Sequence, residues 1–329
     1  MSKSSSIHWA ERVQSFALFA IFCSMLLLAQ PGSVHGQAPL RWKLKQGEAF
    51  EVQLQQQTTS QVAFAGKAAD TKIDLGLELL WTVAAADDKQ IKVRQVVQRI
   101  TFSLQPQKGD AVKYDSLNRA RPTGQARQVA DAVQPLLGAE IEFTMSDRGQ
   151  VISTAPINPA AEKLFAEESA DQSPNVFSRQ ALQTLLRQPL VVLPEEPFAA
   201  DKTWTDEPRE IKSAAGTFMQ ATTYRHAGQV EEAGQTLEKI ELTAKLTPVA
   251  ATATKGSKLT VKSHDHSGTI LFSAAQGRLI RAEQIQKLAT ERPYRETTIA
   301  VTLESKQTTT IRPAGERGAS NGERGASAP

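Results

Sequence analysis

The stretch LGLELLWTV, residues 75–83, decides the fold. Its apolar side chains recur at every second position, namely at Leu75, Leu77, Leu79, Trp81 and Val83. Alternate side chains of a β-strand share one face, so this period predicts a strand with one buried face. Two interpretations stay open for Trp81, Leu77 and Leu79. They anchor a core that fills itself, or they line an apolar ligand cavity.

The same period continues on both sides of this stretch. It predicts strands around residues 40–45, 50–54, 91–104, 141–152, 218–224, 240–246, 259–272, 278–285 and 299–303. In two places, before Ile100 and before Ile270, the parity of the apolar positions reverses. One inserted residue reverses every later side chain, so we predict a β-bulge at each place.

Helical spacing is confined to the middle of the chain. Apolar residues at helical spacing predict a helix over 126–137 that stops at Gly138. An N-cap residue followed by proline is typical of a helix start. Two such pairs predict two more helices, over 158–170 and 174–188. Such short helices persist by burying an apolar stripe, so we expect theirs to pack on the concave face of the sheet. The residues expected there are Leu164, Phe165, Phe177, Leu182 and Leu185, with Phe177 and Leu185 also candidates for a cavity lining.

The predicted fold class is mainly β (α+β): a strongly bent antiparallel sheet or half-open barrel with about three inserted helices. Its outline is similar to that of envelope lipoprotein carriers of the LolA and LppX kind. We predict a single β-rich domain over 37–311. Two stretches in it are alike, Ile141–Ile152 and Ile270–Ile280, and both an internal repeat and chance account for the likeness. A repeat would divide the domain into halves at 40–157 and 204–311, joined by a helical segment over 158–203.

The two ends of the chain have their own composition. An apolar run over 16–29 follows Lys3 and Arg12, which predicts a signal peptide over 1–36 and an exported protein of the periplasm, envelope or extracellular space. The run is shorter than the ~20 residues of a membrane span, so we expect no transmembrane segment after cleavage, and an uncleaved anchor is the alternative. Residues 312–329 repeat GERGAS and predict a disordered tail.

Composition excludes several kinds of chemistry. Cys23 is the only cysteine and lies in the signal, so the mature chain has no disulfide, thiol catalysis or zinc–thiolate site. The net charge of +3 is spread along the chain, and we predict no nucleic-acid partner. No nucleophile-elbow, phosphate-binding or dinucleotide motif occurs, so we predict no catalytic residue and no cofactor. The acids Asp87, Asp110 and Asp147 are typical of turns.

His264-Asp265-His266 is the sharpest local cluster. On a strand both imidazoles share one face and can meet one metal ion, with His226 the only other histidine beyond the signal. The alternative is that they are simply solvent-facing in a polar stretch. We predict no metal site and keep His264 and His266 as the candidates.

Several short motifs occur in a telling order: Leu40–Glu48 (LRWKLKQGE), Tyr114-Asp-Ser116, Leu193-Pro194 before Asp201–Trp204, Tyr224–Gly228, and Gly268–Phe272 before Gly277–Leu279. Together they resemble secreted planctomycete proteins of the domain of unknown function 6263. The resemblance spans residues 40–311, with one departure at Lys202, where glycine is expected. It implies no known activity and transfers no catalytic residue.

These observations favour a non-enzymatic binding or carrier protein of the cell envelope, for an apolar small molecule, a lipid or another envelope protein. One alternative is a structural envelope protein with a self-filled core. The other is a metal-dependent hydrolase that uses His264 and His266.

Overall fold

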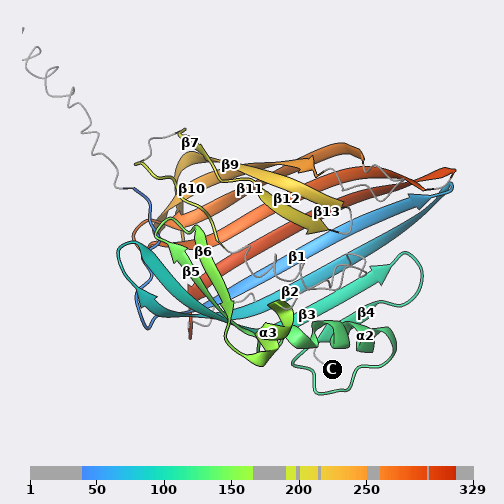
Figure 1. Ribbon diagram of the computed structural model, residues 1–329, viewed down its shortest axis with the longest axis horizontal. Coiled ribbons are helices and arrows are strands. Elements are labelled where there is room, and N and C mark those ends of the chain that lie inside the picture. Colours follow the sequence, from blue (N-terminus) through green and yellow to red (C-terminus); the bar gives the residue numbers. More distant parts are fainter. Residues whose placement is uncertain are drawn as a thin grey trace, which may run out of the picture. The chain divides into compact units, whose positions relative to one another are not determined.

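The computed structural model describes residues 39–165, 190–197, 201–213, 216–249, 260–294 and 296–315. In this part of the chain thirteen strands form one antiparallel sheet (Figure 1). The strands are β1 (Ala49–Phe64), β2 (Lys67–Ala86), β3 (Gln90–Pro106), β4 (Val112–Asp115), β5 (Glu140–Ser146), β6 (Val151–Pro156), β7 (Thr203–Thr205), β8 (Arg209–Ser213), β9 (Gly216–Glu232), β10 (Gln235–Pro248), β11 (Thr260–Ser273), β12 (Arg278–Tyr294) and β13 (Thr297–Pro313). The predicted mainly-β class is confirmed.

The two ends of the described chain meet in the middle of the sheet. The order is β6-β5-β3-β2-β1-β13-β12-β11-β10-β9-β7, with β4 also paired to β3 and β8 to β9. β1 and β13 pair along their length, from Phe50 opposite Pro313 to Phe64 opposite Ile299. The sheet is therefore open, with its earliest and latest strands side by side at its centre.

A short segment before β1 reveals how strongly the sheet bends. The backbone N–H of Trp42 donates to the carbonyl of Asp147 in the β5–β6 turn (2.7 Å), and that of Lys43 to Gly277 in the β11–β12 turn (2.8 Å). β5 and β12 are five strand spacings apart, about 24 Å in a flat sheet at ~4.8 Å per strand. Two consecutive residues span both turns only because the sheet curves around them. We call residues 40–45 the strap, and the face that carries Trp81 the inner face.

The strap corrects one prediction. Residues 40–45 were expected to form a strand, but the structure has no strand there. Leu40, Trp42 and Leu44 are buried, and their alternation arises because the extended strap crosses the ends of the strands with these side chains in the core. A period of two marks extended backbone with one buried face, whether or not it pairs with a sheet.

Trp81 lies at the centre of the core beside the strap. Its side chain is fully buried, as the alternation predicts. Its indole N–H donates to Gln95 Oε1 (2.7 Å), and its ring meets that of Phe143 edge-on with centroids 5.4 Å apart. Leu77 and Leu79 belong to the same cluster.

Both predicted bulges are present. Leu77 lies opposite Ile100 but Leu79 lies opposite Val97, so β3 carries one extra residue there. In β11 the register shifts between Val261 and Ser263. Each bulge keeps the apolar side chains of its strand on the inner face on both sides of the parity change.

The helices follow the predictions as far as they are described. The first is α2 (Gly124–Val133), continued by the 3-10 turn η1 (Gln134–Leu136) and ended by Gly138 at φ 71°. The second is α3 (Pro159–Phe165), where Asn158 Oδ1 accepts from the N–H of Ala161 (2.9 Å). Buried residues of these elements join the core cluster: Val133, Leu136 and Ala161, with Phe165 packed against it.

Other predictions fall on residues outside the described ranges. They are the signal peptide over 1–36, the rest of the helix over 158–170, the helix over 174–188 with Phe177, Leu182 and Leu185, and the tail beyond residue 315; the side chain of Leu164 is also not described. β13 runs to Pro313, so the first two residues assigned to the tail belong to the sheet.

Candidate functional site

The inner face divides into three zones, and the first is an end closed by the strap. A second extended segment, residues 190–197, lies over this end and has no regular secondary structure. We call it the connector. Trp42 Nε1 donates to the carbonyl of Val191 (3.1 Å), and Trp204 Nε1 donates to that of Val192 (2.8 Å). The indole N–H groups of Trp42 and Trp204 therefore fasten the connector.

Polar contacts hold the connector to the β5–β6 turn as well. Leu193 and Arg148 exchange two bonds of 2.8 Å, one from the N–H of Leu193 to the carbonyl of Arg148 and one from Arg148 Nε to the carbonyl of Leu193. Arg41 of the strap pairs with Asp147 (Nε–Oδ2 2.8 Å) and donates to the carbonyl of Pro194 (2.8 Å). Strap, connector and hairpin turn thus form one hydrogen-bonded closure.

Two glycines make room for this closure. Gly149 has φ 85°, and a Cβ there would lie 2.3 Å from the carbonyl oxygen of Val191 and 2.4 Å from Trp42 Nε1. Gly277 has φ 60°, and a Cβ there would lie 2.2 Å from Cβ of Lys43. The two glycines are equivalent positions of the two similar stretches found in the sequence, and both lie against the strap. The internal repeat itself stays a prediction.

The second zone is a band of polar side chains across the middle of the inner face, which we call the polar belt. Cross-strand register places its members on one face of four neighbouring strands. They are Gln56 and Thr58 of β1, Ser305 and Gln307 of β13, Gln284 and Gln286 of β12, and His264 and His266 of β11. Along β13 the belt lies between Leu303 and Ile311, so polar residues interrupt an apolar face.

Some of the belt is satisfied internally. Gln56 Nε2 donates to Ser305 Oγ (3.1 Å), which also lies 3.1 Å from Thr58 Oγ1, and His266 Nε2 lies 3.1 Å from Gln284 Oε1.

Other buried atoms in and beside the belt have no hydrogen-bond partner among the described residues: Gln307 Nε2, Thr309 Oγ1, His264 Nε2 and His266 Nδ1. The exposed fraction is 9% for Gln307 and 1% for Thr309. An unpaired buried polar group costs about 1–3 kcal/mol, so each of these atoms gains from a hydrogen-bond partner such as a water molecule or a ligand.

The histidine pair lies in this belt. The rings of His264 and His266 face one way, with centroids 6.2 Å apart. Burial lowers the pKa of both imidazoles, and for His264 the neighbouring His266 lowers it further. Both are therefore neutral at pH 7, so each ring donates at one nitrogen and accepts at the other.

Among the described residues no group of three His, Cys, Asp or Glu side chains gathers around a point. Asp265 lies on the opposite face of β11. His226, the third histidine that a three-histidine site needs, is buried at the closed end and bonds Glu238 (2.8 Å). The geometry supports a hydrogen-bonding role for His264 and His266.

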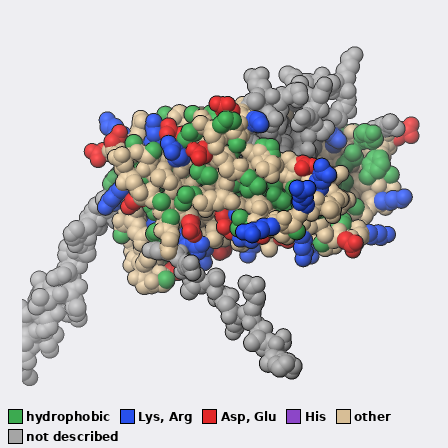
Figure 2. Space-filling model, turned by 90° about the horizontal axis from the view of Figure 1, so that it is seen from below, with side chains coloured by type: hydrophobic (Ala, Val, Ile, Leu, Met, Phe, Trp, Pro, Cys, Tyr) green, Lys and Arg blue, Asp and Glu red, His purple; other side chains and the backbone are tan. Residues whose placement is uncertain are grey.

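The third zone is the far end of the sheet, where two hairpins extend beyond the described parts of their neighbouring strands. The last pairs with the flanking strands are Thr71 with Pro106 and Glu291 with Thr260. We call the projecting hairpins the tongue; its described residues are 61–70 of β1–β2 and 291–294 and 296–302 of β12–β13. Figure 2 shows hydrophobic side chains gathered at this end of the molecule, on the right of the view. Among the described residues, no helix is long and apolar enough to cross a membrane.

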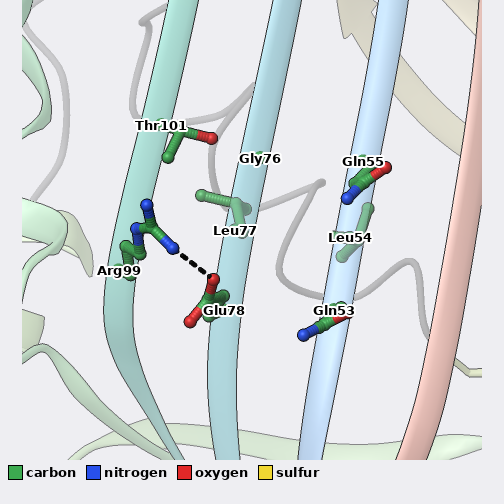
Figure 3. A pocket seen from close by; sticks show the side chains of 8 residues that line it. All are labelled: Gln53, Leu54, Gln55, Gly76, Leu77, Glu78, Arg99 and Thr101. Atoms are coloured by element: carbon green, nitrogen blue, oxygen red, sulfur yellow. Dashed lines mark hydrogen bonds and ion pairs between the residues drawn. The ribbon is translucent and has the colours of Figure 1, made fainter. Parts of the chain in front are cut away.

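The outer face carries a small pocket of about 160 Å³ between β1, β2 and β3 (Figure 3). Two charged residues line it, Arg99 and Glu78, and Arg99 donates to Glu78 (3.0 Å) and bidentately to Asp115 (3.0 and 2.6 Å). These bonds raise the pKa of Arg99 and lower that of Asp115. The pocket is below the ~300 Å³ of typical ligand sites, and its cation is occupied.

Of the acids predicted to serve turns, Asp87 does so, whereas the carboxylate of Asp147 binds the strap. Asp87 Oδ1 accepts from the N–H groups of Lys89 and Gln90 (both 2.8 Å), which lowers its pKa. Asp147 lies in the β5–β6 turn and pairs with Arg41 of the strap.

The sequence analysis does not predict the polar belt. Its signal was present, because Gln56 and Thr58 continue the parity of Phe50, Val52 and Leu54.

Comparison with known proteins adds little. No protein-family model and no curated protein matches the chain, so membership of the domain of unknown function 6263 family stays a prediction. A solved structure described as lipid–protein interactions in lipovitellin is similar at a TM-score of 0.45 and 14% identity, covering 84% of this chain and 26% of that chain. The chain thus spans about a quarter of the lipovitellin chain.

Two further similarities involve bacterial outer membrane proteins. An outer membrane channel from Pseudomonas putida F1 aligns at a TM-score of 0.24 and 7% identity, over 86% of this chain and 100% of that one. The outer membrane protein OprG from Pseudomonas aeruginosa aligns at 0.17 and 8% identity, over 82% and 98%. At these scores none of the three similarities bears on what the chain binds.

Proposed function

We propose that this protein is an exported, non-enzymatic binding or carrier protein of the cell envelope. Its ligand is an amphiphile with an apolar part and a hydrogen-bonding head, held on the inner face of the sheet. The observation that carries the proposal is the polar belt, whose unpaired buried atoms interrupt an otherwise apolar concave face.

The chemistry of the unpaired atoms defines the head of the ligand. Gln307 Nε2 can only donate, the hydroxyl of Thr309 can donate or accept, and a neutral imidazole does one at each nitrogen. A carboxylate, ester or hydroxyl oxygen accepts from Gln307 Nε2, from the Thr309 hydroxyl and from His264 Nε2 when that nitrogen carries the ring hydrogen. His266 donates through Nε2 to Gln284 Oε1, so its Nδ1 is an acceptor and suits the hydrogen of a hydroxyl head. Apolar side chains lie on both sides of the belt, with Leu54 and Ile311 towards the closed end and Leu303 towards the tongue. They suit an acyl or isoprenoid chain.

The test is titration of the protein with a dansyl-labelled fatty acid, for the unaltered chain and for Gln307→Leu. Leucine has a similar size and cannot donate, so we expect about tenfold weaker binding. We expect the free energy of unfolding to stay the same or rise, because a buried unpaired amide is removed. Gln55→Leu, on the exposed outer face of the neighbouring β1, is the matched control and should bind like the unaltered protein.

Saturable binding that Gln307→Leu leaves unchanged would place the ligand away from the belt. Absence of saturable binding by the unaltered protein contradicts the carrier proposal. The structural envelope protein with a self-filled core then becomes the better interpretation.

A further inference from the structure

We propose that the tongue is a membrane-docking surface that inserts its apolar tip into a bilayer containing anionic lipid. This inference goes beyond the proposed function, because it concerns a different surface and holds whether or not the inner face carries a ligand.

The first observation is the exposure of large apolar side chains at the tip. Val62 and Phe64 are each 42% exposed and Tyr294 is 43% exposed. The rings of Phe64 and Tyr294 meet edge-on across the intervening β13, with centroids 5.9 Å apart. The two aromatic rings therefore hold one position at the extreme end of the sheet instead of scattering over the surface.

The second observation is the charge beside them. Cross-strand register places one row on the inner face of the tongue: Lys67, Phe64, Ile299 and Arg292. Two apolar side chains are flanked on both sides by a cation. Both cations are exposed, and neither forms an ion pair with a described residue. The next row towards the belt, with Val62 and Val301 at its centre, contains no charge.

The nearby acids do not cancel this row. Glu291 pairs with Lys262 (2.9 Å), and Asp70 accepts from Gln61 (2.8 Å) on the outer face. Glu296 lies in the β12–β13 turn, beyond the row.

An apolar tip flanked by basic side chains matches the interface of an anionic bilayer. The apolar groups enter the acyl boundary while long basic side chains reach the phosphates. Figure 2 shows Lys and Arg side chains beside the hydrophobic group at this end. The tongue and the polar belt lie on the same face of β1, β13 and β12. Docking through the tongue would therefore bring the belt close to the membrane.

The experiment is co-sedimentation of the full chain with phosphatidylcholine vesicles, with and without phosphatidylglycerol. We expect binding to the anionic vesicles that weakens with salt. Phe64→Ser should weaken it by roughly tenfold. The double variant Lys67→Gln/Arg292→Gln should weaken it by about fivefold for each charge and abolish the preference for anionic lipid.

Matched controls are Ile152→Ser, at an apolar residue 53% exposed on β6, and Lys306→Gln, on the outer face of β13. Both should bind vesicles like the unaltered chain. Any binding through the apolar run at 16–29 is common to all variants, so it cannot imitate the expected losses.

Three results would overturn the inference. They are no binding to anionic vesicles, binding that the tongue variants leave unchanged, and a dimer in light scattering that Phe64→Ser dissociates, which would make the tongue a contact between two copies. Titration of Phe64→Ser with the dansyl-labelled fatty acid keeps the two proposals apart, because the belt is intact in this variant and its binding should be retained.

Discussion

The two ends of the inner face are built from the same strands and end in opposite environments. At one end Phe50 of β1 lies opposite Trp81 of β2, and both are buried. At the other end of the same pair Phe64 lies opposite Lys67, and both are exposed. The difference is the strap and connector, which cover the first end. Alternation therefore fixes the face on which a side chain lies, and a separate segment of the chain decides whether that face is buried.

The largest expected effect is at the closed end. Trp81→Ala removes a fully buried ring and leaves Gln95 without its donor, so it should lower the free energy of unfolding by about 3–5 kcal/mol. Chemical denaturation measures it, with Ile152→Ala on the exposed side of β6 as control. A loss below about 1 kcal/mol, the size of a surface change, would mean that the closed end is not packed as described.

The closure itself is tested by a pair of glycines. Gly149→Ala and Gly66→Ala both place alanine at a positive φ, 85° and 77°, but only Gly149 faces the strap and connector. We expect Gly149→Ala to cost about 1–3 kcal/mol more than Gly66→Ala in denaturation, because its Cβ meets two fixed atoms. Equal losses would show that the β5–β6 turn is not held by Trp42 and the connector.

The polar belt between the two ends predicts a pH dependence. The pKa values of His264 and His266 are lowered in the fold from an ordinary value of 6.5, so below pH 6.5 the unfolded chain takes up protons first. Their contribution to stability is complete above pH 6.5 and is lost as the pH falls towards their folded pKa values. Unfolding measured between pH 7.5 and about 5 should have a shallower slope in His264→Gln/His266→Gln than in the unaltered chain. Identical slopes would place both rings in solvent.

The smallest expected effect is at the tongue. Phe64→Ala should change the free energy of unfolding by no more than about 0.5 kcal/mol, as expected for an exposed side chain. Thermal and chemical denaturation both measure it. A loss approaching that of Trp81→Ala would erase the difference between the two ends and show that the tongue packs against something in the folded protein.

Much of the closed end could be predicted from local pattern. The period of two placed Trp81 on the buried face, and the parity reversals before Ile100 and Ile270 located two bulges, because each depends on a few neighbouring residues. The strap was misassigned as a strand because its alternation is real, while its partners lie in turns more than a hundred residues away.

The belt was missed for a related reason. A polar residue at an inner position looks like the polar half of an alternating strand until the neighbouring strands are aligned. Gln307 and Gln56 become a band only when β1 and β13 are known to pair. The tongue could not be predicted for the same reason. It exists because two hairpins are longer than the strands beside them, and the length of one strand says nothing about the length of its neighbours.

The strap and the central β1–β13 pair have a consequence for the order in which we expect the chain to fold. Lys43 binds Gly277, and Phe50 of β1 pairs with Pro313 at the end of β13, so contacts at the centre of the sheet close loops of more than two hundred residues. Synthesis releases the N-terminal end first, and long-range pairing is slow because the loop entropy is lost before the contact forms. β2 and β3 can form a hairpin as soon as they emerge, whereas β1 waits with one edge unpaired until the last strand arrives. The first described residues of this protein are thus expected to be among the last to find their partners.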